Sequence, residues 1–176
     1  KFADEFDIPA RYATYEALAE DDQIDAVYIG TPHPMHLPHS VLCLTHGKAV
    51  VCEKPFTVNK RQTEELIQVA RREKRFLMEA MWTRFLPVMA QARQWIKEGL
   101  IGEPRMVQSD FGFRAWINEE GRLFSPDFAG GGLLDVGVYC VSLASMIFGE
   151  PPAAVKTLAH LGETGVDEQN AAVLGY

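Results

Sequence analysis

The sequence predicts an α/β protein in which a doubly wound parallel sheet is followed by the beginning of an α+β domain. Three apolar runs lie within residues 25–32, 48–55 and 75–82, and helical patterns over 35–45 and 60–74 separate them. Alternating strands and helices with short connections are typical of a parallel sheet with right-handed crossovers. Because the runs are almost continuously apolar, we expect strands that are buried on both faces.

Capping residues set the helix boundaries in this first part. Thr14 suits the N-cap of a short helix over residues 15–20, and Asn59 suits that of the helix over 60–74. Gly47 is a typical residue just beyond the end of the helix that precedes it.

After residue 82 the rhythm changes, so we expect two domains, over residues 1–82 and 83–176. The second domain contains two helical patterns and three strand patterns. We expect a helix over 86–99, a half-exposed strand over 104–116, a buried helix over 129–149, and strands of an open, mainly antiparallel sheet over 153–161 and 170–176.

Composition excludes several classes of function. With 47% hydrophobic and 23% charged residues, the chain is an ordinary globular protein, and its net charge of −7 disfavours nucleic acid and anionic membranes as partners. The most apolar stretch, Leu133–Phe148, is too short to span a bilayer and carries Asp135, so we expect no membrane segment.

The three cysteines, Cys43, Cys52 and Cys140, lie in apolar surroundings without metal-site spacing. They predict reduced core thiols and a cytoplasmic location. The chain has no initiator Met, opens as if inside a helix and stops as if inside a strand, so we expect a piece of a longer protein.

Polar residues gather where the predicted strands end. "GTPHPMH", "CEKPF" and "EAMWTRF" all follow apolar runs, and the carboxyl ends of parallel strands form the edge at which such folds bind ligands. Lys54 is the cation of this set, although a strand that simply surfaces into a charged turn explains its position equally well. His33, His36 and His39 have spacing that suggests metal, but Pro34 and Pro38 distort it. We favour capping or ligand contact and assign no metal site.

Asp135 and Tyr139 are the polar residues of an otherwise apolar helix, four positions apart and therefore on one side of it. A satisfied core pair and a catalytic pair both fit this pattern. A lysine ammonium beside a tyrosine favours the phenolate, which proton transfer with an alcohol requires, so Lys54 becomes useful if it meets Tyr139. The glycines at 130–132 do not match a dinucleotide fingerprint, and we expect them to allow close approach to a ligand or a neighbouring sheet.

Four motifs, "GTPHPMH", "VVCEKPF", "LMEAMWTRF" and "GGGLLDVGVYC", closely resemble those of the Gfo/Idh/MocA oxidoreductases in order and spacing. The resemblance implies a Rossmann-type sheet that lacks its first strands here, together with the Gly-rich phosphate loop and the residue that selects NAD or NADP. Many relatives carry His where this chain has Tyr139.

The resemblance also assigns roles to residues. It implies that Lys54 and Tyr139 are catalytic, with Asp135 supporting the site geometry. The substrate would meet Phe111 and Trp82. The cofactor, NADP or alternatively NAD, would contact Thr31, Pro32, His33, His36, Glu53, Lys54, Pro55, Trp82 and Arg84.

The function implied is hydride transfer between a secondary alcohol of a sugar or cyclic diol and NAD(P), in a homodimer that pairs through the sheet of the second domain. The alternative is a non-catalytic relative of the same fold that senses NAD(P) as a regulatory or scaffold protein. An intact set of Lys54, Asp135 and Tyr139 disfavours it, because a sensor needs no proton relay.

Overall fold

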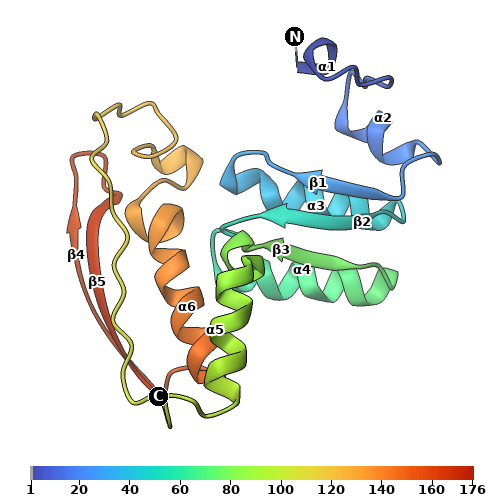
Figure 1. Ribbon diagram of the computed structural model, residues 1–176. Coiled ribbons are helices and arrows are strands. Elements are labelled where there is room, and N and C mark those ends of the chain that lie inside the picture. The colour runs from blue at the N-terminus through green and yellow to red at the C-terminus, as the bar shows by residue number, and fades with distance from the viewer. Residues whose placement is uncertain (1) are drawn as a thin grey trace.

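A three-stranded parallel sheet dominates the first half of the computed structural model, which describes residues 2–176 (Figure 1). The strand order is β1-β2-β3, and two helices make the crossovers. The elements are β1 (Ala26–Ile29), α3 (His36–Thr45), β2 (Ala49–Glu53), α4 (Lys60–Glu73) and β3 (Leu77–Ala80). The parallel Rossmann-type sheet is therefore confirmed.

The core lies between this sheet and the two crossover helices. Val50 and Cys52 of β2 are fully buried there, and Leu44 of α3 and Leu66 of α4 pack in the same cluster. Full burial of each such aliphatic side chain contributes roughly 1.5–3 kcal/mol. The expectation of strands buried on both faces is wrong for this chain, because α3 and α4 both follow right-handed crossovers and cover the same face. Tyr28 is exposed on the other face.

The predicted caps are confirmed. Thr14 Oγ1 accepts from Ala17 N at 3.1 Å at the start of α2 (Tyr15–Glu20). Asn59 Oδ1 accepts from Gln62 N at 3.0 Å at the start of α4. A one-turn helix, α1 (Phe2–Glu5), lies near the N-terminus.

The second half of the chain places two helices beside an antiparallel hairpin (Figure 1). A 3₁₀ turn, η2 (Trp82–Phe85), links β3 to the first of these helices. The remaining elements are α5 (Pro87–Lys97), the 3₁₀ turn η3 (Pro126–Phe128), the π-helical turn η4 (Leu133–Gly137), α6 (Val138–Phe148), β4 (Ala154–Leu161) and β5 (Asp167–Gly175).

Two expectations for this half are wrong. Residues 104–116 run extended beside the hairpin but form no strand, because no neighbouring strand within residues 2–176 accepts their backbone hydrogen bonds. Trp116 is 87% exposed as a result. The helix expected to be buried over 129–149 starts as the π turn and continues as α6, of which only Ala144 is buried.

By length and composition alone, the helical stretch Pro126–Phe148 could also cross a membrane, with a mean hydropathy of 1.7. The core helix of a water-soluble protein passes the same test, so this is weak support for a span. Cys43 and Cys52 lie in the core as predicted, and burial raises the pKa of the Cys52 thiol to about 11.

Candidate active site

The carboxyl ends of β1, β2 and β3 meet at one edge of the sheet, and this edge faces α5, α6 and the glycine-rich turn (Figure 1). The strands end at Ile29, Glu53 and Ala80. The three polar motifs therefore arrive together, as expected for parallel strands.

Lys54 leaves the end of β2 and contacts the second half of the chain. Its Nζ donates to the backbone oxygen of Asp135 at 2.6 Å and lies 3.4 Å from Asp135 Oδ1. The Lys54 and Asp135 side chains are 16% and 8% exposed, so this is a nearly buried ion pair. The same Nζ lies 5.1 Å from the ring centre of Tyr139. The structure thus brings together the three residues predicted to be catalytic.

The Tyr139 hydroxyl has a second polar neighbour. Trp82 Nε1 donates to it at 2.9 Å, and the Phe111 ring lies 5.3 Å from the Tyr139 ring. Both aromatic residues predicted to meet the substrate therefore surround Tyr139. A cavity of about 200 Å³ opens beside them, lined by residues of η2, α5 and α6 together with Asp110 and Phe111.

Asp135 lies in the π turn η4, whose wider register was not predicted from the four-residue spacing to Tyr139. Its carboxylate accepts from Arg122 Nη1 at 2.8 Å. Burial opposes ionisation of this carboxyl, but the Arg122 hydrogen bond and the charges of Lys54 and Arg122 outweigh it, so the pKa of Asp135 is lowered. Sequence reasoning missed Arg122, because it lies in an irregular segment where no spacing or periodicity marks it.

The glycines before Asp135 let the hairpin approach. Asp167, the first residue of β5, accepts from Leu133 N at 2.7 Å and so holds the start of the π turn. Gly131 has φ +110°, and a Cβ there would collide with the Asp167 carboxylate. Of the two expectations for these glycines, close approach to a neighbouring sheet is the one observed.

The histidines after β1 support the edge. His36 is 1% exposed, and its two ring nitrogens each lie 2.8 Å from a backbone carbonyl, those of Thr31 and Pro55. This geometry favours a role in joining the turns after β1 and β2 over direct cofactor contact. His33 Nδ1 lies 3.1 Å from the Ala129 carbonyl, across the two halves of the chain, and burial lowers the pKa of its imidazole.

The remaining predicted cofactor residues lie at the same edge. Glu53 accepts from the Tyr28 hydroxyl, a hydrogen bond that raises the pKa of Tyr28 to about 12. Pro32 is exposed and Pro55 is buried. Arg84 donates to Ser142 Oγ at 2.9 Å and to the Ser142 carbonyl at 3.0 Å, which fastens η2 to α6.

His39 Nδ1 lies 3.1 Å from Thr31 Oγ1 and completes the set of three histidines. Within residues 2–176, no group of three His, Cys, Asp or Glu side chains is placed to hold a metal ion. Contact of the predicted residues with cofactor and substrate stays a prediction.

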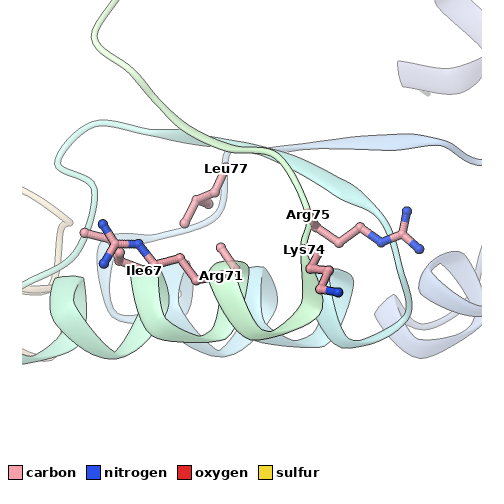
Figure 2. A pocket seen from close by; sticks show the side chains of 6 residues that line it. Ile67, Arg71, Lys74, Arg75 and Leu77 are labelled. Atoms are coloured by element: carbon pink, nitrogen blue, oxygen red, sulfur yellow. The ribbon is translucent and has the colours of Figure 1, made fainter.

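A larger cavity, of about 300 Å³, lies away from this edge (Figure 2). It lies at the end of α4 and the start of β3, so it opens at the opposite edge of the sheet from Lys54. Its lining consists of Ile67, Ala70, Arg71, Lys74, Arg75 and Leu77.

Comparisons with known proteins agree with this architecture. The family model described as "Oxidoreductase family, NAD-binding Rossmann fold" matches residues 1–81, and the "GFO/IDH/MocA C-terminal domain" matches residues 89–176. The resemblance inferred from the four motifs is thereby confirmed. The boundary near residue 83 stays a prediction of the sequence.

Individual relatives narrow the similarity. The chain is 44% identical over 177 aligned residues to trans-1,2-dihydrobenzene-1,2-diol dehydrogenase of Mus musculus, covering 100% of the chain and 53% of that protein. It therefore spans about half the length of the curated relatives that it matches.

Among solved structures, aldose-aldose oxidoreductase from Caulobacter crescentus in complex with glycerol is 28% identical, with a TM-score of 0.84 over 93% of this chain and 50% of that one. A 3-ketoreductase from Actinomadura kijaniata in complex with TDP-benzene and NADP is 29% identical, with a TM-score of 0.72 over 98% of this chain and 52% of that one.

Proposed function

Because this chain belongs to the Gfo/Idh/MocA oxidoreductase family, we propose that it carries the catalytic centre of an NAD(P)-dependent dehydrogenase. The substrate we propose is a secondary alcohol of a cyclic diol or a sugar. The mouse relative is named for a cyclic diol and the Caulobacter structure for an aldose, which supports both substrate classes. The observation that carries the proposal is the nearly buried Lys54 ammonium over the ring of Tyr139.

Oxidation of a secondary alcohol removes a proton from oxygen and a hydride from carbon, and this chain handles the proton. Tyr139 accepts it on its phenolic oxygen. Lys54 favours the phenolate by its charge, and the Trp82 N–H donates to the same oxygen. NAD(P), when bound, supplies the hydride acceptor at C4 of its nicotinamide.

The edge of the sheet fits an anionic dinucleotide. The two nearby acidic side chains are already engaged, since Glu53 accepts from the Tyr28 hydroxyl and Glu79 accepts from Phe56 N at 3.0 Å. The edge therefore presents the Lys54 ammonium rather than a free carboxylate. The residues that would hold the nicotinamide half are Thr31, Pro32, His33, Glu53, Lys54, Pro55, Trp82 and Arg84.

Finer properties of the whole protein belong to the same proposal. We propose NADP as the cofactor, supported by the NADP complex of the Actinomadura neighbour. A homodimer through the second-domain sheet is supported by the exposed apolar residues Val155 and Leu158 on β4. A cytoplasmic location is supported by three free thiols.

Replacement of Tyr139 tests the proposed function. General acid–base catalysis contributes roughly 10²–10⁴-fold, so Tyr139→Phe in the full-length protein is expected to lower turnover by that order while NADPH affinity is kept. Tyr15→Phe is the matched control, because Tyr15 is an exposed tyrosine on α2. Turnover of Tyr139→Phe equal to that of the parent would remove Tyr139 from the mechanism.

A panel assay separates the enzyme from the sensor. NAD(P)H fluorescence is followed with the full-length protein and a range of aldoses and cyclic diols. Reduction of cofactor by one of them supports the dehydrogenase. Cofactor binding without turnover of any of them would favour the non-catalytic sensor.

A further inference from the structure

Arg122 is the closest cation to the Asp135 carboxylate, although no motif marks it. Its Nη1 donates to Asp135 Oδ1 at 2.8 Å, whereas Lys54 Nζ is 3.4 Å from the same oxygen. The shorter contact of Lys54 is to the backbone carbonyl of Asp135, at 2.6 Å. The carboxylate therefore receives its shortest charge-assisted hydrogen bond from Arg122 rather than from Lys54.

Backbone packing brings Arg122 to this place. The N–H of Gly131 donates to the Leu123 carbonyl at 2.9 Å, and a Cβ at Gly130 would lie 2.6 Å from that carbonyl oxygen. Only glycine permits so close an approach. The segment that carries Arg122 is thus fixed to the turn that leads into Asp135, while the Arg122 side chain itself remains 61% exposed.

The charges around Tyr139 depend on this arginine. Arg122 and Lys54 are two cations around one carboxylate, which leaves a net positive charge beside the phenol. Without the Arg122 charge, Lys54 and Asp135 would form a neutral pair, and the field that favours a phenolate would weaken.

No other charged group at the edge supplies the missing charge. His33 also feels Lys54 and Asp135, but burial lowers its pKa, so its imidazole is neutral at pH 7. Glu53 and Glu79 are acidic and engaged in hydrogen bonds, and the Arg84 guanidinium is bound to Ser142.

We propose that Arg122 is a positioning residue for the dehydrogenase reaction: it holds the Asp135 carboxylate and thereby leaves the Lys54 charge available to Tyr139. This inference rests on the proposed function, since Arg122 acts through Asp135 and Lys54 rather than on the reacting atoms.

The pH dependence of turnover tests the proposal in the full-length protein. Arg122→Gln keeps a hydrogen-bond donor and loses the charge, so the limb of the pH–rate profile that reports the catalytic base is expected to move to higher pH. A shift of about one unit corresponds to a roughly tenfold loss of turnover below the limb. Arg122→Lys is expected to restore most of the loss, and NADPH affinity stays at the parental value in both variants.

Arg72→Gln is the matched control. Arg72 is 65% exposed and pairs with Glu73 on α4, so it resembles Arg122 in exposure but lies away from the site. Its profile is expected to overlay that of the parent. A parental profile for Arg122→Gln, or a loss that Arg122→Lys does not restore, would overturn the proposal.

A second measurement needs no turnover. Titration of the Asp135 carboxyl by ¹³C NMR is expected to give a higher pKa in Arg122→Gln, because the Arg122 hydrogen bond is the main influence that lowers it against burial. An unchanged titration would overturn the proposal. An inactive parent would overturn the proposed function instead, and the titration would then decide on its own whether Arg122 controls Asp135.

Discussion

Two regions of this molecule concentrate positive charge, and they differ in what surrounds the cations. At the carboxyl edge of the sheet, Lys54 is nearly buried and contacts Asp135, a residue 81 positions away. At the opposite edge, Arg71, Lys74 and Arg75 line a cavity (Figure 2), and these three exposed side chains make no ion pair within residues 2–176.

The difference teaches that charge and concavity do not by themselves mark a reactive site. Cations at the end of α4 are stabilised by the helix dipole and by water, so they need no further role. A lysine with 16% of its side chain exposed loses most of its hydration and requires compensating partners. The Lys54 partners come from both halves of the chain, so the fold itself maintains the arrangement.

Removal of the Lys54 charge is expected to have the largest effect. Lys54→Met keeps the side-chain length, and turnover at neutral pH is expected to fall by roughly 10²-fold or more, within the range of acid–base catalysis. Part of the activity should return as the pH rises, because hydroxide then deprotonates the phenol that the ammonium no longer favours. The measurement is a pH–rate profile of the full-length protein.

Lys74→Met is the matched control for that experiment, because it removes a lysine charge from the other cationic region. Its profile is expected to follow that of the parent. If the Lys54→Met profile also did so, Lys54 would be only a strand end that surfaces into solvent, and the contrast between the two regions would disappear.

The sequence was sufficient to predict the first half of the fold. Alternation of apolar runs with helices capped by Thr14 and Asn59 depends on local chemistry, and the structure confirms both caps. It was less informative for residues 104–116, because a strand exists only when another strand accepts its hydrogen bonds. Such pairing is non-local, so alternation within this segment could not establish it.

The same distinction applies to the candidate site. The placement of Lys54 and Tyr139 was predicted from strand ends and from the family resemblance, and the structure brings the two together. The contact of Arg122 with Asp135 could not be predicted, because it depends on how Gly130 packs against the Leu123 carbonyl. Residues that act through backbone packing leave no periodic signal.

The buried carboxylate gives a second, smaller effect, on stability. Because Asp135 has a lowered pKa in the folded protein, its stabilising contribution is present above the unfolded-state pKa of roughly 3.9 and is lost as the pH falls through the folded-state value. Asp135→Asn is expected to lower the free energy of unfolding at pH 7 by about 1.5–3 kcal/mol, the range for hydrogen bonds to charged groups.

Chemical denaturation of the full-length protein between pH 7 and pH 3 measures this difference. The parent and Asp135→Asn are expected to converge in stability at the acidic end, where the carboxyl of the parent takes up a proton. A difference that stays constant over the whole range would show that the carboxylate charge does not hold the two halves together.

The smallest effect is expected at the cavity at the end of α4. Arg71 and Lys74 are exposed and make no ion pair within the described residues, so Arg71→Gln with Lys74→Gln removes two solvated charges and leaves no buried group without a partner. Surface substitutions of this kind change stability by about 0.5 kcal/mol or less, and turnover is expected to be unchanged. Denaturation and steady-state turnover of the double variant measure both quantities. A loss of turnover comparable to that of Lys54→Met would mean that this second cationic region also supports the reaction, in which case burial with partners would no longer distinguish the reactive lysine from the solvated ones.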